Sequence, residues 1–142
     1  NLMIKFILSV IFSYSLLYSQ NILHEDFIVS IGNKIYSPLS DKPFTGKVVK
    51  FFLIEQIEYE YNVTDGQKNG QFISFFKGGN ILEKGSYKMG LKEGMWIKYD
   101  QYYNRKRELT HFKSMEYLFK NGKPIQVITF SINGDVRKKE EF

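Results

Sequence analysis

The sequence contains no cysteine and no alanine, and it has only 3 prolines and 2 histidines among its 142 residues. Without cysteine the chain has no disulfide, no thiolate metal ligand and no thiol nucleophile. The histidines, His24 and His111, stand 111 − 24 = 87 positions apart, so they offer no ligand pair at metal-binding spacing. The sequence also lacks a phosphate-binding P-loop and a G-x-S-x-G nucleophile elbow. We therefore expect a protein that is not an enzyme and that holds no metal or cofactor.

Aromatic residues dominate what is present: the chain has 13 Phe, 10 Tyr and 1 Trp, and hydrophobic residues make up 43% of it. Aromatic and β-branched side chains fit a pleated, half-buried surface better than a helix. The 11 glycines supply residues for tight turns. This composition predicts an all-β fold with many short connections.

The net charge of +5 is mild and spread along the chain. Two short basic clusters occur, at Arg105–Arg107 and at Arg137–Lys139, and the second runs directly into Glu140 and Glu141. We interpret both clusters as ordinary solvated charge and expect no nucleic-acid partner. An anion-binding patch remains the alternative interpretation.

The N-terminal residues 3–20 read MIKFILSVIFSYSLLYSQ, with Lys5 before an apolar run from Phe6 to Tyr18. A run of this length is short for a bilayer-spanning helix. The layout is that of a secretory signal peptide with a cleavage point near Ser19 and Gln20. We therefore predict a signal-peptide helix over residues 1–19, with membrane contact only through it. The mature protein would be periplasmic or extracellular. A strand or buried helix of the fold is the alternative.

Glycine recurs at a fixed period in the middle of the chain. Gly46, Gly70 and Gly94 are spaced by 70 − 46 = 24 and 94 − 70 = 24, and Gly66 and Gly90 also differ by 24. The second pair begins a G-x-K-x-G connector that is written twice. Such a period indicates a repeat architecture, here an elongated antiparallel sheet of successive β-hairpins. We assign residues 20–42 to an N-terminal hairpin and linker and residues 43–142 to the repeat domain, with these five glycines as its structural positions.

Alternation along the first strand of each unit places apolar side chains on both faces. One face is apolar in all three units, and we predict that it forms the core: Val49, Phe51, Ile73, Phe75, Ile97 and Tyr99. The other face carries the candidate binding stripe, a column of large apolar side chains: Val48, Phe72 and Trp96, extended by Phe52 and Phe76. Lys50, Ser74 and Lys98 lie beside this column. If nothing covers this stripe, it is an exposed contact surface. Burial by a neighbouring segment or by curvature is the alternative.

After Tyr103 the period shifts, and we align Glu108, Phe112 and Lys113 with Glu83, Tyr87 and Lys88 at an offset of 25. Residues 113–116 then stand where a third connector is expected. Asn121-Gly122 and Asn133-Gly134 predict two further hairpin turns. The charged residues 137–141 would cap the array.

The segment Pro43-Phe44-Thr45-Gly46, the G-x-K-x-G connectors and the aromatic pair in each unit resemble the bacterial MORN-variant repeat proteins, often described as YwqK-family antitoxins of toxin–antitoxin systems. The resemblance covers about residues 27–142. It implies an elongated antiparallel sheet and no catalytic residues.

We predict an exported, non-enzymatic module that acts through protein binding or as a structural element, with an unidentified protein as its partner. The main alternative is an antitoxin or immunity-like inhibitor of one cognate protein. A hydrolase using Glu58, Glu60 or His111, and a lipid-binding protein, are the remaining alternatives.

Overall fold

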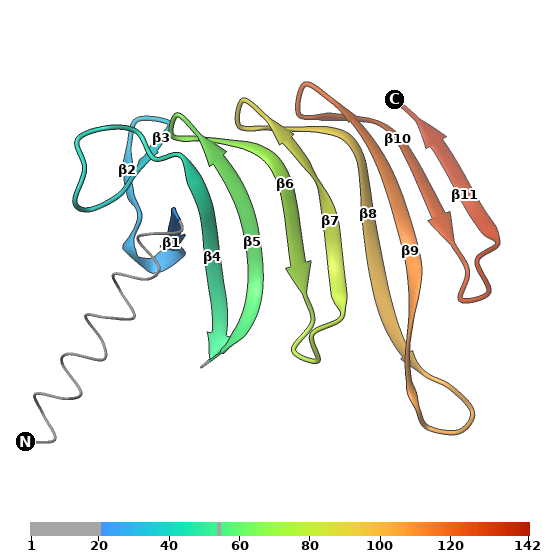
Figure 1. Ribbon diagram of the computed structural model, residues 1–142. Coiled ribbons are helices and arrows are strands. Elements are labelled where there is room, and N and C mark those ends of the chain that lie inside the picture. The colour runs from blue at the N-terminus through green and yellow to red at the C-terminus, as the bar shows by residue number, and fades with distance from the viewer. Residues whose placement is uncertain (1–20, 54) are drawn as a thin grey trace, which may run out of the picture.

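The computed structural model describes residues 21–53 and 55–142 and is all-β (Figure 1). The predicted leader over residues 1–19 lies outside the described residues. One short 3₁₀ helix, η1, accompanies the strands in the described ranges, and none of their helices has the length and hydrophobicity to cross a membrane. The elements are β1 (Ile22–His24), η1 (Glu25–Phe27), β2 (Val29–Ile31), β3 (Lys34–Tyr36), β4 (Gly46–Leu53), β5 (Gln56–Thr64), β6 (Gln67–Phe75), β7 (Ile81–Lys88), β8 (Leu91–Tyr103), β9 (Leu109–Lys120), β10 (Lys123–Phe130) and β11 (Val136–Glu141).

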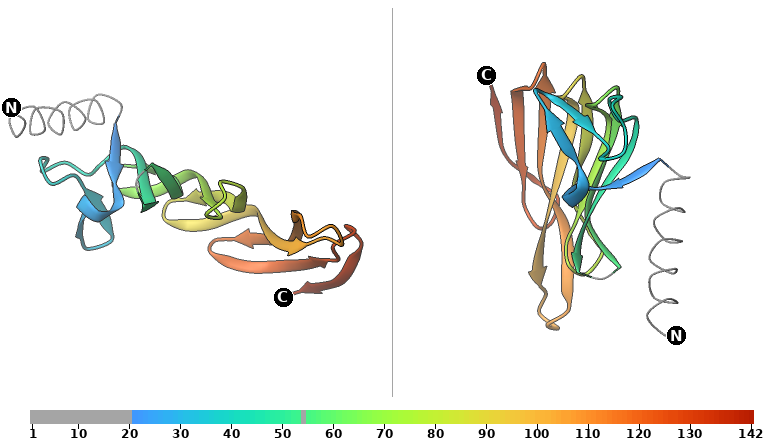
Figure 2. Two further views of the ribbon diagram at one scale, coloured as in Figure 1. Left: turned by 90° about the horizontal axis from the view of Figure 1, so that it is seen from below. Right: turned by 90° about the vertical axis from the view of Figure 1, so that its left-hand side faces the viewer.

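Consecutive hairpins build one large sheet, as the sequence predicts. Its strand order is β1-β4-β5-β6-β7-β8-β9-β10-β11. Every neighbouring pair is antiparallel except β1 and β4, which run parallel. The sheet is a single twisted layer, and the separate β2–β3 hairpin lies at its N-terminal end (Figure 2).

Three hairpin turns at one end of the sheet share the same backbone conformation. Both central residues of each turn have positive φ: Asp65 (48°) and Gly66 (76°), Met89 (50°) and Gly90 (83°), Asn121 (49°) and Gly122 (78°). Two consecutive positive φ values define a type I′ turn, whose twist matches that of antiparallel strands. Glycine meets the second position without strain, which accounts for its recurrence there.

Each of these turns is hydrogen-bonded to the segment before it, which is the linker for the first turn and the preceding hairpin for the other two. The glycine N–H groups donate to backbone carbonyls: Gly66 to Phe44 (2.8 Å), Gly90 to Lys68 (2.8 Å) and Gly122 to Lys92 (2.9 Å). The preceding N–H groups donate to side chains: Asp65 to Thr45 Oγ1 (2.9 Å), Met89 to Asn69 Oδ1 (3.3 Å) and Asn121 to Glu93 Oε2 (2.7 Å). The turns therefore form a second ladder, running across the sheet along its edge.

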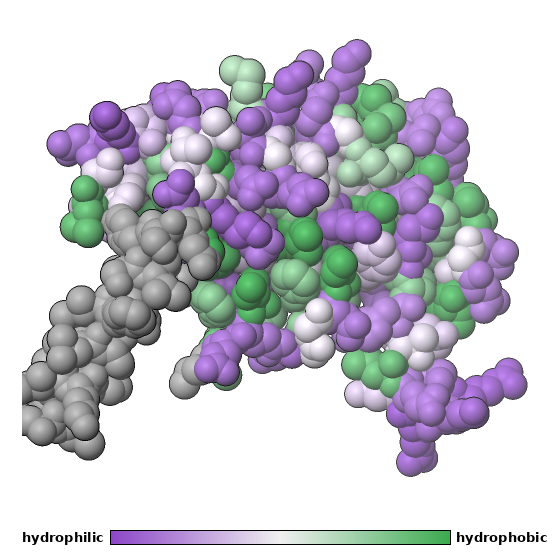
Figure 3. Space-filling model, viewed as in Figure 1, coloured by the Kyte–Doolittle hydropathy of each residue, from purple (hydrophilic) through white to green (hydrophobic). Residues whose placement is uncertain are grey.

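The third turn corrects the sequence alignment. Asn121-Gly122 occupies the position of the connector turn, at 122 − 90 = 32 residues after Gly90 rather than near residue 115. Accordingly Phe119 pairs with Gly94 as Tyr87 pairs with Gly70, so the predicted offset of 25 is wrong. The extra residues extend β8 and β9, whose hairpin projects beyond its neighbours (Figure 1). Its tip is covered by hydrophilic side chains (Figure 3).

The core lies on the sheet face opposite to the predicted one. We call this the tryptophan face; it carries Val48, Tyr61, Phe72 and Trp96. Of the six residues predicted to form the core, only Val49 is buried, and the others are half-buried. The prediction was wrong because alternation gave both faces apolar residues, and what covers a face cannot be read from alternation.

The N-terminal segment covers the first part of the tryptophan face. Leu23 packs with Val48, Tyr61 and Val63 in a buried cluster. Around it lie partly buried residues from the N-terminal segment, its linker and two strands: Ile28, Ile35, Phe44, Tyr59 and Phe72. The Tyr61 hydroxyl donates a hydrogen bond to Glu25 Oε2 at 2.7 Å, which ties η1 to β5.

Met89→Asn is expected to stabilise the protein by about 0.5–1 kcal/mol, because Met89 adopts φ 50° with an exposed side chain and asparagine tolerates this conformation better. The other two turns carry Asp65 and Asn121 at this position, residue types that tolerate left-handed backbone. Urea unfolding followed by circular dichroism would measure the gain. A loss of stability would mean that the Met89 side chain makes a contact that outweighs its backbone strain.

Candidate functional site

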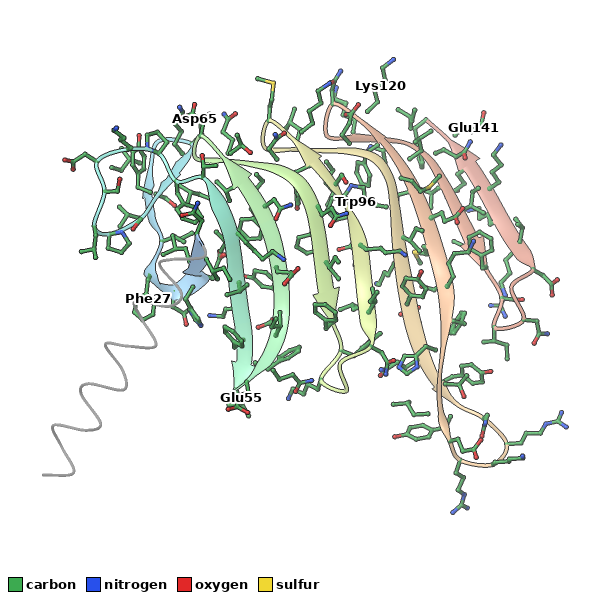
Figure 4. All side chains as sticks on the ribbon, viewed as in Figure 1. Phe27, Glu55, Asp65, Trp96, Lys120 and Glu141 are labelled. Carbon is green, nitrogen blue, oxygen red and sulfur yellow. The ribbon has the colours of Figure 1, made fainter. Side chains whose placement is uncertain are left out.

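The single tryptophan occupies the middle of the sheet, over β7 (Figure 4). Gly85 leaves the space that the indole fills, because a Cβ at this glycine would overlap the ring. The indole Nε1 donates to the Ser86 carbonyl at 3.1 Å, which satisfies its only polar group. Trp96 is fully buried, although it lies on a single sheet.

Neighbouring aromatic rings and one lysine enclose this indole. Phe72 stacks against it at 5.3 Å between ring centroids, while Tyr87 and Phe119 meet it edge-on at 5.1 and 6.1 Å. The Lys92 ammonium lies 3.7 Å from the ring centroid and completes the enclosure. A cation over an aromatic ring contributes roughly 0.5–1 kcal/mol at exposed sites and about 2 kcal/mol when desolvated, and Lys92, with a side chain 31% exposed, lies between these limits.

The lysine in each G-x-K-x-G connector therefore has a defined place. Lys68 lies 4.2 Å from the Tyr61 ring centroid and 5.4 Å from that of Tyr87, one unit before Lys92 and Trp96. The sequence showed the recurrence of lysine but not its contact with the aromatic row.

Two members of the predicted binding stripe are interior residues. Val48 and Trp96 both have 0% exposure, so neither side chain has surface to offer a partner. This burial corrects the interpretation of these two residues as contacts: the N-terminal cluster covers Val48, and the aromatic row and Lys92 cover Trp96. Phe72, Phe52 and Phe76 are half-buried, and Phe76 contacts the His111 ring at 5.9 Å.

Beside the enclosed indole the tryptophan face has a groove of about 390 Å³. It is lined by Leu82, Glu83, Lys92, Lys98, Tyr117 and Phe119. Sequence reasoning missed Tyr117 and Phe119 because they lie on β9, after the shift in period. The correct alignment of Asn121-Gly122 with the earlier turns is the signal that places them on this face.

The charges in the groove are unequal. Glu83 lies directly opposite Lys98 in the ladder, yet its carboxylate pairs with Lys92 at 3.4 Å. The Lys98 ammonium has no ion-pair or hydrogen-bond partner among the residues that the structure describes. A half-buried lysine therefore stands unpaired in a groove that two aromatic side chains also line.

Tyrosines on the same face stay protonated well beyond neutral pH. Burial, and then the hydrogen bond to Glu25, raise the pKa of Tyr61 far above its ordinary value. Burial likewise raises the pKa of Tyr59 and of Tyr87. Tyr61 therefore serves as a packing group and as a neutral hydrogen-bond donor to Glu25.

Two of the three residues considered for hydrolysis, Glu60 and His111, have other partners. Glu60 accepts a hydrogen bond from Lys47 Nζ at 2.7 Å, and the His111 ring nitrogen contacts Gln101 Nε2 at 2.8 Å. His24 Nδ1 accepts from the Asp26 N–H at 3.1 Å. Within residues 21–53 and 55–142, no three His, Asp or Glu side chains are grouped as metal ligands.

The five structural glycines all lie on the strands or turns of the sheet. Gly66 and Gly90 form the ladder of turns, while Gly70 (φ 102°) and Gly94 (φ 70°) sit within β6 and β8. Gly46 begins β4, where a Cβ would collide with the Asn21 carbonyl oxygen and close the space that β1 occupies.

Comparison with known proteins gives no relative: no family model, no curated protein and no solved structure matches the chain.

Proposed function

We propose that this chain is an exported, non-enzymatic β-sheet module that binds a protein partner through the tryptophan face. The observation that carries the proposal is the groove beside Trp96, which is lined both by aromatic side chains and by the unpaired Lys98. Binding sites are typically concave, with polar groups that fix orientation, and their volumes begin at roughly 300 Å³.

The packing of the sheet favours recognition over chemistry. η1, β1 and the β2–β3 hairpin lie toward the β4 end of the sheet. Among the described residues, the main packing contacts of β8 and β9 are with each other and with their neighbours in the sheet, β7 and β10. Hydrogen-bonded turns and stacked rings hold the groove-lining strands in place. A preformed surface loses little conformational entropy on binding.

Export is supported by the sequence of residues 3–20, which has the charge, apolar core and small residue of a signal peptide. The recurring glycine connectors support kinship with the MORN-variant repeat proteins, in which successive hairpins form an elongated sheet. The arguments for export and for kinship with these repeat proteins do not depend on the groove.

Site-specific photo-crosslinking tests the binding face. A photoreactive amino acid at position 98 lies in the groove, whereas the same amino acid at position 84 lies on the opposite face of β7. We expect a crosslinked protein band from position 98 and none from position 84, in cells that express the protein naturally. Equal crosslinking from both positions, or crosslinking from position 84 alone, would contradict the proposal. N-terminal sequencing of the recovered protein tests export, and an uncleaved N-terminus in the cytosol would refute that part.

A further inference from the structure

The residues that line the groove beside Trp96 also indicate the chemistry of its occupant. This inference rests on the proposed function above, in which the groove binds a protein partner. We infer that the groove binds an extended acidic segment of the partner, with a carboxylate at Lys98 and an apolar side chain on the rings of Tyr117 and Phe119. The inference follows from the charge of the groove, its spacing and the position of the indole.

Charge comes first. Lys92 and Lys98 bring two ammonium groups to the groove, and Glu83 brings one carboxylate, which Lys92 already engages. The surplus is one positive charge, at Lys98. Because Lys98 is half-buried within the groove, a carboxylate beside it is less screened than one at an open surface.

Spacing selects an extended chain. Tyr117 and Phe119 are two residues apart on β9, and their ring centroids are separated by 6.0 Å. In an extended segment, side chains at positions i and i+2 point to the same side and lie roughly 6.6 Å apart. Trp96 pairs with Tyr117 and Lys98 pairs with Met115, so Lys98 stands one such two-residue step along the strands from Tyr117. An acidic residue followed two positions later by an apolar one therefore matches the lysine and the aromatic floor together.

The two lysines differ in what they already contact. Lys92 has Trp96 and Phe119 beneath it and Glu83 beside it, so its role in the folded protein is to enclose the indole. Lys98 is available for the partner. The specificity of the groove for a carboxylate should therefore depend on Lys98.

Trp96 reports on the groove directly, because it is the only tryptophan of the chain and lies under a groove-lining lysine. The probe is a capped octapeptide in which Glu and Leu alternate at the odd positions and Ser fills the even ones. Its control replaces each Glu with Gln. The protein is used in the form recovered from cells, and the titration follows tryptophan emission.

We expect saturable binding of the Glu peptide and binding of the Gln peptide weaker by about tenfold or more. Lys98→Gln should weaken binding of the Glu peptide by a similar factor, while the matched change Lys84→Gln, on the opposite face, leaves it unchanged. Both variants should melt at the temperature of the wild type, since neither lysine forms an ion pair among the described residues.

Equal affinity for both peptides, equal loss in both variants, or no saturable signal would overturn the inference. Tighter binding of polygalacturonate, or of vesicles containing phosphatidylserine, would also overturn it by assigning the groove to another class of ligand. If the peptide fails while position 98 still crosslinks to a protein, the proposed function stands and only the acidic chemistry is wrong. If neither peptide binding nor crosslinking at position 98 is observed, both the proposed function and the acidic chemistry of the occupant are refuted.

Discussion

Replacing Gly85 with valine is expected to destabilise the protein by about 3–5 kcal/mol, the range seen when a large buried aromatic side chain is lost. A Cβ at Gly85 would overlap the six-membered and five-membered rings of Trp96, so the indole must leave its position. The displaced ring then loses its stacking on Phe72, its hydrogen bond to Ser86 and its contact with Lys92. Valine is itself well suited to a strand, so the effect isolates the collision.

Gly78→Val is the matched control. Neither Gly78 nor Gly85 requires a positive φ, and the nearest atom to a Cβ at Gly78 is Asn80 Nδ2, at 3.9 Å. We expect this variant to stay within about 0.5 kcal/mol of the wild type, as surface substitutions usually do. Urea unfolding followed by circular dichroism and tryptophan emission measures both variants. A Gly85→Val protein with wild-type stability and unshifted emission would show that the indole does not lie on Gly85.

Tyr61→Ala is expected to cost about 3–5 kcal/mol as well, because Tyr61 is only 1% exposed and lies in the cluster that joins β5 to the N-terminal segment. The loss removes the ring that packs with Val48 and Val63 and releases the hydroxyl contact to Glu25. Hydrogen exchange should then show early opening of β1 and η1.

Tyr61→Phe separates the two contributions. It keeps the ring and removes only the hydroxyl that donates to Glu25, for which we expect a loss of about 1.5–3 kcal/mol, the range for a hydrogen bond to a charged group. If Tyr61→Phe were as damaging as Tyr61→Ala, the hydroxyl rather than the ring would dominate. If neither variant changed the unfolding free energy, the N-terminal segment would not be docked on β5.

The sequence predicted the sheet well where its signals are local. Aromatic content, alternating strands and Asn-Gly or Asp-Gly pairs each report on a few consecutive residues, and the hairpins at Asn121-Gly122 and Asn133-Gly134 are found where these pairs predict them. The offset in the third hairpin was misjudged because Phe112 matches Tyr87 in residue type. Only the pairing of Gly94 with Phe119 shows which aromatic is equivalent.

The candidate site could be predicted only in part. Trp96 was singled out for its size and its place in the column, but its burial depends on Gly85 from the neighbouring strand and Lys92 from its own. The sequence places Lys98 beside the aromatic column. Its lack of an ion pair could not be predicted, because it depends on Glu83 pairing with Lys92 instead. Burial and ion pairing of this kind depend on side chains from different strands, and they are set only once the strands are paired in the sheet.

By itself the sequence determined that this chain builds a sheet of hairpins, because turn geometry and strand preference are properties of short segments. Only the tertiary structure decided which face became the interior, because both faces carry apolar side chains and the N-terminal segment packs against one of them. The tertiary structure also decided where the groove lies, because its lining side chains come from three strands, β7, β8 and β9.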